Sequence, residues 1–281
     1  MTIARFRPAA VLPALLLCSP LPACAGQRPP IVEQAAPAPP YAQLADLTID
    51  SPVVVDATIA STAKIKGTEA ASVPPGTVRY YVEADVLALI RGPQAIPPRV
   101  GYLLDVPNGP DGRQPKLKRL RVLLFARPVA GTPGQLQLVN PAAQRAWSPA
   151  TDALVRRIAG ELVAGDAPPA VTGIGNAFHV PGSLPGEGET QVFLTTADNR
   201  PVSLTILRRP GEEPRWAVAL SEIVDDAAGP PQRDTLLWYR LACALPPALP
   251  ARATQALEAA DAAVAREDYR YVLDQLGPCE R

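Results

Sequence analysis

Apolar and polar residues alternate between positions 53 and 135, and this period of two limits the fold more than any other feature of the sequence. In 78–89, for example, Val78, Tyr80 and Val82 alternate with Arg79 and Tyr81, so one face is apolar and the other faces solvent. Such alternation is typical of a half-buried strand. The same pattern predicts strands at 53–62, 99–106, 118–127 and 135–139.

Proline and glycine separate these predicted strands. The chain contains 35 prolines, which interrupt short apolar runs and do not form one low-complexity tract. Residues 108–112 and 131–134 combine Gly with Pro, Asn or Asp, as hairpin-type connections do. Five short strands joined in this way predict a small antiparallel β-barrel or sandwich over 41–147, and an OB-like barrel is the specific shape we expect.

A helix is predicted to begin the second half of the chain. Ser148 suits the N-cap and Pro149 the first helical position, while Leu154, Ile158 and Leu162 recur every four residues. The helix should stop before residue 165. We therefore place a domain boundary between a β-rich part, 41–147, and an α+β part, 148–281.

The remaining pattern predicts a smaller sheet and C-terminal helices. Residues 166–189 lack periodicity and are expected to form a long loop, a feature that is often functional in compact domains. Strands at 190–196, 202–208 and 215–224 predict a three-stranded antiparallel sheet. A helix is expected from Asp234 to Leu245, followed by a helical hairpin of 251–266 and 268–276. The chain as a whole is expected to be α+β.

The N-terminus has the order of a secretory signal. Arg5 and Arg7 precede the apolar run 9–17, and Ala23 and Ala25 form an A-x-A-like cleavage site around Cys24. Residues 1–25 are therefore predicted to be a signal peptide, and 26–40 a Pro-rich linker. Cleavage after Ala25 would release a soluble periplasmic or secreted protein. Cleavage before Cys24 would instead leave a lipid anchor on that residue.

No segment beyond the signal reaches the length and apolarity of a membrane span, so none is expected in the mature chain. Export would place the two remaining cysteines, Cys243 and Cys279, in an oxidising compartment. Because neither has another partner there, a Cys243–Cys279 disulfide is expected to tie the helical hairpin to the preceding helix.

Charge and aromatic content disfavour nucleic acid as a partner. Acidic and basic residues number 27 each and aromatic residues make up 5% of the chain, without a basic stripe that carries interleaved aromatics. The basic cluster 116–121 flanks an apolar run. We interpret it as an edge strand whose charges discourage pairing with other chains, with an anion or lipid-headgroup patch as the alternative.

His179, the one histidine of the sequence, limits the catalytic chemistry. A two-histidine zinc site cannot be built from it, and no cofactor or metal motif is present. Any serine–histidine hydrolase would use His179, with Ser183 as the nearby hydroxyl, although the G-x-S-x-G turn is missing. Glu187 and Glu189 could form a carboxylate pair, act as ligands of a hard cation, or lie on a solvated turn. These four residues are the candidate catalytic residues, all within 173–190.

The sequence therefore favours a non-enzymatic envelope protein that binds or scaffolds an envelope protein or a glycan. Two alternatives remain: a hydrolase-type enzyme with its site in 173–190, and a peptide- or inhibitor-type binding module on the N-terminal barrel. The last predicts a groove lined by exposed apolar residues on the sheet of 41–147. Phe178 and Trp147 lie near loop starts and could line a glycan or peptide groove. Core packing is nevertheless the expectation for every aromatic of this group except Phe178, that is for Trp147, Trp216, Trp238 and Tyr239.

Overall fold

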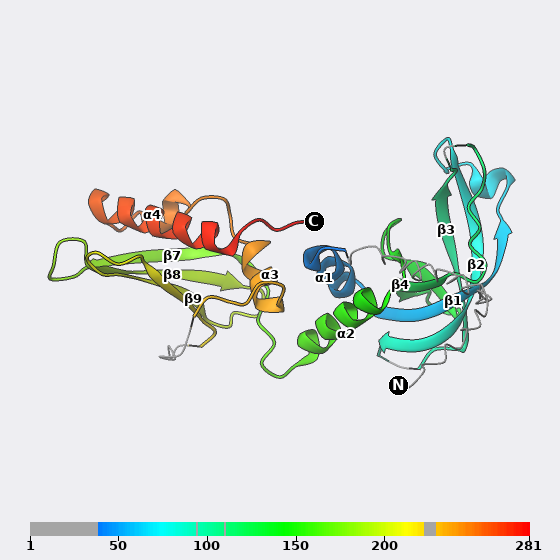
Figure 1. Cartoon of the computed structure of the whole chain (residues 1–281), viewed down its shortest axis with the longest axis horizontal. Coiled ribbons are helices and arrows are strands. Elements are labelled where there is room, and N and C mark those ends of the chain that lie inside the picture. The colour runs from blue at the N-terminus through cyan, green and yellow to red at the C-terminus, as the bar shows by residue number, and fades with distance from the viewer. Residues whose placement is uncertain (1–38, 94, 110, 222–228) are drawn as a thin grey trace, which may run out of the picture. The chain divides into compact units, whose positions relative to one another are not determined.

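The computed structural model describes residues 39–93, 95–109, 111–221 and 229–281 (Figure 1). The predicted signal peptide, Cys24 and the linker up to residue 38 lie outside these ranges. The first element is α1 (Tyr41–Asp50), which the sequence pattern did not reveal. Its buried residues include Tyr41, Leu44 and Leu47, so the helix has an apolar side, but ten residues without a side-chain cap give only a weak signal.

Within the described residues, five strands close the predicted barrel. They are β1 (Val53–Lys64), β2 (Thr77–Arg91), β3 (Arg99–Pro107), β4 (Arg121–Pro128) and β5 (Gln135–Leu138). The order is β1-β2-β3-β5-β4, and β4 pairs with β1 to complete the ring. All of these pairings are antiparallel except β3 with β5, which is parallel. Of the two predicted alternatives, a barrel or a sandwich, the structure shows the barrel.

The inner faces of the strands fill the barrel as the alternation predicted. Val78, Tyr80, Val82 and Ala84 of β2 are buried in one apolar cluster with residues of β1, β3 and β4. The barrel contradicts the edge-strand interpretation of 116–121, because β4 pairs with β1 on one side and with β5 on the other. The charged residues at 116–119 precede this strand, and Arg121 begins it.

Two short elements and a helix accompany the barrel. They are the 3-10 helix η1 (Gly67–Ala70), the strand β6 (Gln144–Ala146), which pairs with β4, and α2 (Pro149–Val163). The start of α2 confirms the capping prediction, because the Ser148 hydroxyl accepts a hydrogen bond from the Thr151 N–H (3.1 Å) and Pro149 opens the helix. Ile158 is fully buried on the apolar side of α2.

The second sheet has four antiparallel strands within the described residues, one more than predicted. They are β7 (Val171–Pro181), β8 (Gly188–Thr196), β9 (Val202–Arg208) and β10 (Arg215–Ala219), in the order β10-β9-β8-β7. The expected loop 166–189 is thus wrong, because most of it is β7 and the start of β8. Register shifts between Val171 and Gly173 and between Ile174 and Ala177 interrupt the period of two, so bulges hide this strand from pattern reading.

Helices follow the second sheet. They are α3 (Leu236–Ala242), the 3-10 helix η2 (Ala251–Thr254) and α4 (Ala259–Leu276). The predicted helical hairpin is wrong, because α4 continues unbroken through residues 266–268 and packs against β7 and β8 (Figure 1). The predicted cap at Asp234 is also displaced by one residue: the Thr235 hydroxyl accepts from the Trp238 N–H (3.3 Å).

The disulfide prediction is confirmed by a bonded Cys243–Cys279 pair. Cys243 follows directly after α3 and Cys279 lies after α4, with their Cα atoms 5.1 Å apart across 36 residues of sequence. The bond therefore holds the C-terminal segment beside α3. None of the described helices is long and apolar enough to cross a membrane.

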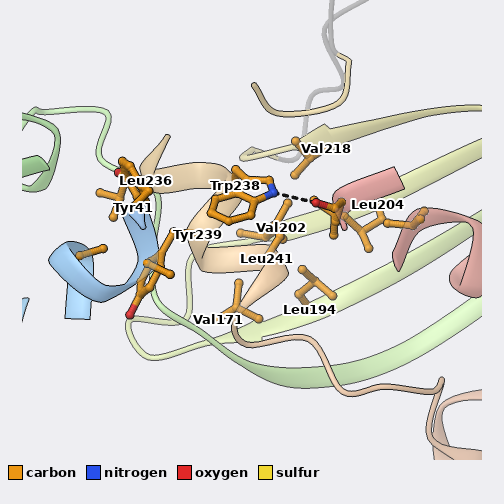
Figure 2. Close-up of a cluster of buried hydrophobic side chains, with 14 of the residues drawn as sticks. Tyr41, Val171, Leu194, Val202, Leu204, Val218, Leu236, Trp238, Tyr239 and Leu241 are labelled. Carbon is orange, nitrogen blue, oxygen red and sulfur yellow. Dashed lines mark hydrogen bonds between the residues drawn. The ribbon is translucent and has the colours of Figure 1, made fainter. Parts of the chain in front are cut away.

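The core beside the second sheet gathers aromatic and aliphatic side chains from distant parts of the sequence (Figure 2). Trp238 and Tyr239 of α3 pack with Trp216 of β10 in this buried cluster, as predicted. The Trp238 indole N–H donates to the carbonyl oxygen of Leu276 (2.8 Å), so the buried polar end of this side chain is satisfied.

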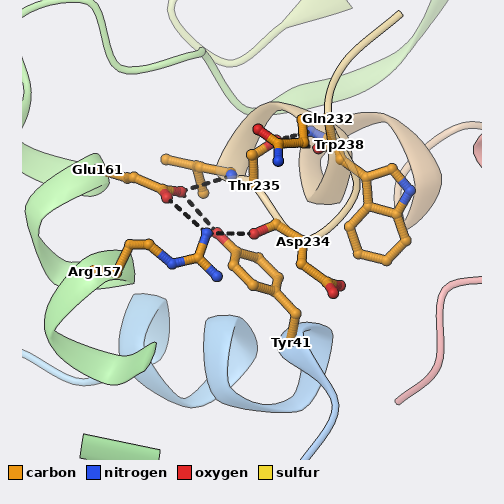
Figure 3. Close-up of polar contacts among 8 residues, drawn as sticks. Tyr41, Arg157, Glu161, Gln232, Asp234, Thr235 and Trp238 are labelled. Atoms are coloured by element: carbon orange, nitrogen blue, oxygen red, sulfur yellow. Dashed lines mark hydrogen bonds and ion pairs between the residues drawn. The ribbon is translucent and has the colours of Figure 1, made fainter. Parts of the chain in front are cut away.

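A set of polar contacts joins α1, α2 and the start of α3 (Figure 3). The Tyr41 hydroxyl donates to Glu161 Oε2 (2.8 Å), and the same oxygen accepts from the Leu236 N–H (2.7 Å). Arg157 donates to the carbonyl oxygen of Asp234 (2.6 Å). Burial, together with the neighbouring Glu161 carboxylate, raises the pKa of the Tyr41 hydroxyl well above its usual range. The phenol therefore stays protonated and keeps its role as a donor.

Candidate functional site

A groove with a volume of about 650 Å³ opens on the wall of the barrel. It is lined by residues of three strands and of the connections after β4 and β5. The strand residues are Arg79 and Tyr81 of β2, Tyr102, Leu103 and Asp105 of β3, and Gln135, Leu136, Gln137 and Leu138 of β5; the others are Val129, Val139, Asn140 and Pro141. The groove therefore follows the line where β3 and β5 lie next to each other.

The groove exists because β3 and β5 separate soon after they meet. Their parallel pairing consists of Gly101 with Gln135 and Tyr102 with Leu136, whereas β3 itself continues to Pro107. We call the opening between Leu103–Pro107 and the end of β5 the seam. Leu136 belongs to the buried barrel core, and Leu138 packs against that core, so an apolar floor lies at the bottom of the seam.

A glycine allows one wall of the groove to form. A Cβ atom at Gly101 would lie 2.1 Å from the hydroxyl oxygen of Tyr81 and 2.9 Å from Gln135 Nε2. The tyrosine therefore occupies the space that any other residue at position 101 would take. Its hydroxyl accepts a hydrogen bond from Gln135 Nε2 (2.8 Å), which ties β2 to β5 across β3.

The two charged residues in the lining neutralise each other. Arg79 Nε and Nη2 donate to the two carboxylate oxygens of Asp105, each at 2.7 Å. This hydrogen bonding lowers the pKa of the Asp105 carboxyl below its ordinary value and raises the pKa of Arg79. The groove consequently presents a fixed ion pair and no excess of charge to a ligand.

The predicted catalytic histidine points into a buried polar network. His179 Nδ1 lies 2.9 Å from the hydroxyl of Thr190, which in turn donates to Asp268 Oδ2 of α4. Arg208 Nε donates to Asp268 Oδ1 (2.6 Å). Because the Thr190 proton is given to the carboxylate, His179 Nδ1 acts as the donor to Thr190 Oγ1. Thr190 and Asp268 are fully buried, so this network links β7, β8, β9 and α4 from inside.

Of the other predicted catalytic residues, Ser183 and Glu187 lie on the turn between β7 and β8, and Glu189 lies at the start of β8. Glu187 Oε2 accepts from the backbone N–H of Ser183 (3.0 Å) and of Leu184 (3.2 Å), and from the Ser183 hydroxyl (3.3 Å). Glu189 accepts from Gln191 Nε2 (2.7 Å). The structure thus joins Ser183 with Glu187, whereas the contacts of His179 are with Thr190.

The two candidate groove aromatics have different surroundings, both outside the seam. The Phe178 side chain is exposed on β7 and packs edge-to-face against Phe193 of β8, with ring centroids 5.8 Å apart. Trp147 is stacked under the guanidinium of Arg121, 3.7 Å from its ring centroid. The same guanidinium forms two hydrogen bonds with buried Asp56 (2.9 and 2.6 Å), so this stack belongs to the barrel's own packing.

The seam residues escaped sequence-based reasoning about sites. The candidate catalytic residues were reactive side chains, whereas the seam is lined by tyrosines, glutamines, aliphatic residues and one ion pair. A glycine inside the otherwise regular strand 99–106 was the available signal, since an isolated strand glycine marks a close approach or a bulge. Among the described residues, no group of three or more His, Cys, Asp or Glu side chains is placed to hold a metal ion.

Comparison with known proteins adds no family to these observations. No protein-family model matches the chain, and no curated protein matches its sequence at a significant level. The function therefore has to be inferred from the geometry of the groove and of the two sheets.

Proposed function

We propose that this chain is an exported, non-enzymatic binding protein of the cell envelope, and that its barrel takes the ligand in the seam. The observation that carries the proposal is the groove of about 650 Å³ at the point where β3 and β5 separate. Ligand sites of proteins are commonly concave, partly apolar and of about this volume. The exposed Leu103 and Val129 in its lining match the groove expected of a binding module on the barrel.

The topology supports an OB-like assignment of the barrel. The strand order β1-β2-β3-β5-β4, closed by β1 with β4, gives a five-stranded barrel in which one junction is incomplete. OB-folds are five-stranded, partly open barrels that bind ligands over strands 2 and 3. Arg79, Tyr81, Leu103 and Asp105, all of β2 and β3, line the seam groove here.

Export is proposed from the leader at residues 1–25, with release after Ala25 or lipid attachment at Cys24 as its two routes. The Cys243–Cys279 disulfide supports this localisation, because such bonds persist in oxidising compartments. Intact mass distinguishes the routes, since a diacylated Cys24 adds several hundred daltons to the mature protein.

A non-enzymatic role is supported by the way the candidate catalytic groups are used. The hydroxyl closest to His179 is that of Thr190, which is fully buried and donates to Asp268. A nucleophile has to reach a substrate, and this hydroxyl is enclosed by the network. Glu187 is engaged by the backbone of its own turn.

The experiment is a capture from envelope extract with the full chain, expressed with its own leader and purified through a C-terminal tag. Leu103→Glu places a charge in the groove, and Leu87→Glu is the matched control. These side chains are 54% and 53% exposed, both on barrel strands, but Leu87 lies outside the groove lining. We expect Leu103→Glu to lose bound material that Leu87→Glu retains. Equal capture by both variants, with unchanged melting temperatures, would refute the assignment of the seam as the ligand site.

A further inference from the structure

We propose that the ligand of the seam is an extended peptide segment that pairs with the open edge of β3 as an added strand. This inference rests on the proposed function, because it names the ligand class for the same groove. It depends on the direction of backbone groups, which can be followed from hydrogen bonds on either side of β3.

The backbone groups of β3 alternate between its two neighbours. On the β2 side, the Val86 N–H donates to the carbonyl oxygen of Pro98 and the Asn108 N–H donates to that of Gly76, both at 2.8 Å. On the β5 side, the Gly101 N–H donates to the carbonyl oxygen of Gly134 (2.8 Å). The N–H and C=O groups of even-numbered residues of β3 therefore point toward β2, and those of odd-numbered residues point toward β5.

It follows that the backbone groups of Leu103 and Asp105 face the seam. The paired part of β5 ends at Leu136, so the N–H and C=O of Asp105 lie beyond the last pair of the β3–β5 ladder. Pro107, the next odd-numbered residue, has no N–H to offer. A proline at this position is typical of an open strand edge.

The opposite wall of the seam, formed by the end of β5, also has backbone groups that point into the seam. The Gln135 carbonyl oxygen accepts from the Val129 N–H (3.0 Å) on the β4 side, and the Gly134 carbonyl oxygen accepts from β3. By alternation, the backbone of Leu138 also faces the seam. Both walls of the seam thus end in strand edges, but β5 ends at Leu138 whereas β3 continues to Pro107. The longer free edge is that of β3, and an extended peptide is the ligand that complements such an edge.

The length and charge of the seam define the peptide further. At about 3.3 Å per residue, the path from Leu103 to Pro107 is about 13 Å, enough for about four residues of an added strand. The apolar floor at Leu136 and Leu138 favours apolar side chains at alternate positions of that segment. Because Arg79 and Asp105 are paired with each other, the groove favours an uncharged segment over a polyanion such as nucleic acid.

The test uses the full chain and a phage-displayed library of short random peptides as its source of probes. Peptides that bind the wild type and Leu87→Glu, but not Leu103→Glu, are synthesised with an N-methyl group at each position in turn. Strand addition predicts a period of two: methylation at every second position weakens binding about tenfold or more, because it removes a backbone donor that faces β3. Methylation at the intervening positions changes binding by less than about twofold.

Amide hydrogen exchange supplies a second, independent measurement. Binding should slow exchange of the Asp105 N–H, which faces the seam. The N–H groups of Leu104 and Val106 face β2 and should exchange slowly with and without peptide. Binding without the period of two, or without protection at Asp105, would overturn strand addition.

The outcomes separate this inference from the function on which it rests. One outcome is that no library peptide binds in a way that depends on Leu103, whereas capture of envelope material does depend on it. In that outcome the captured material resists protease and is degraded by a muramidase. The seam would then be a glycan site, so the binding function would stand and the peptide inference would fall. If neither probe distinguishes Leu103→Glu from Leu87→Glu, both proposals fall.

Discussion

Replacement of Asp268 by asparagine tests whether the buried network stabilises the second sheet. The Asp268 carboxylate is fully buried on α4 and holds Arg208 of β9 at 2.6 Å and the Thr190 hydroxyl of β8. Asparagine keeps nearly the same shape but removes the negative charge. The substitution therefore leaves the Arg208 cation without its nearest partner in a mostly buried position.

The expected loss follows from the burial of the pair. Removing one member of a buried ion pair costs about 3–5 kcal/mol. The lower end applies here, because the Arg208 side chain keeps 23% of its surface exposed and Glu267 remains 3.4 Å away. We expect the free energy of unfolding to fall by about 3 kcal/mol. For a protein of this size that corresponds to a decrease in Tm of roughly 6–12 °C.

Urea denaturation followed by circular dichroism measures this loss, with Asp274→Asn as the control on an exposed position of the same helix. The control should change the free energy of unfolding by less than about 0.5 kcal/mol. Arg208→Met combined with Asp268→Asn should cost less than the sum of the two single substitutions, because the pair is removed together. A loss below about 1 kcal/mol for Asp268→Asn, or strict additivity in the double variant, would refute the network as a source of stability.

Three further predictions concern the disulfide and the groove. Replacing both Cys243 and Cys279 by serine should lower the free energy of unfolding by about 3–4 kcal/mol, as expected for a loop of 36 residues; a loss under 1 kcal/mol in non-reducing urea titrations would contradict this. Since the folded-state pKa of Asp105 is lowered, its stabilisation is present above the unfolded value near pH 4 and is lost as the pH falls through the folded value. Asp105→Asn should accordingly flatten the acid limb of stability between pH 7 and pH 3, and an unchanged limb would argue against the shift. Gly101→Ala should displace the Tyr81 ring, lower the free energy of unfolding by about 1 kcal/mol through loss of its hydrogen bond, and weaken binding in the groove. Unchanged capture and unchanged stability would mean that the groove wall does not need this glycine.

The sequence alone predicted those features that depend on neighbouring residues. The alternation in 78–89 predicted which residues of β2 face the barrel core, and Ser148 with Pro149 predicted the start of α2. The disulfide followed from the number of cysteines beyond the predicted signal peptide. Each of these inferences needs only neighbouring residues or a count of one residue type.

Elements that depend on distant partners could not be predicted in the same way. Bulges in β7 break the alternation, and the register with β8 restores the strand only in three dimensions. Asp268 was expected to begin a second helix, but it lies inside α4, where Thr190 and Arg208 bind its carboxylate. Closure of the barrel through β1 with β4 is likewise a pairing of segments about 70 residues apart in sequence.

The difference between local patterns and distant pairings also explains why the sequence suggested a site in 173–190 and gave no indication of the seam. Histidine, serine and glutamate are recognised by their chemistry wherever they occur, so a search for reactive side chains finds His179 before any fold is known. A strand edge binds through N–H and C=O groups that every residue possesses, and these groups become available only where a ladder stops. The backbone groups of Leu103 and Asp105 face the seam because β5 leaves β3 after Tyr102, and that point is set by pairing between distant strands. Sites of this kind are therefore found from topology, by asking which backbone groups lie beyond the last pair of a sheet.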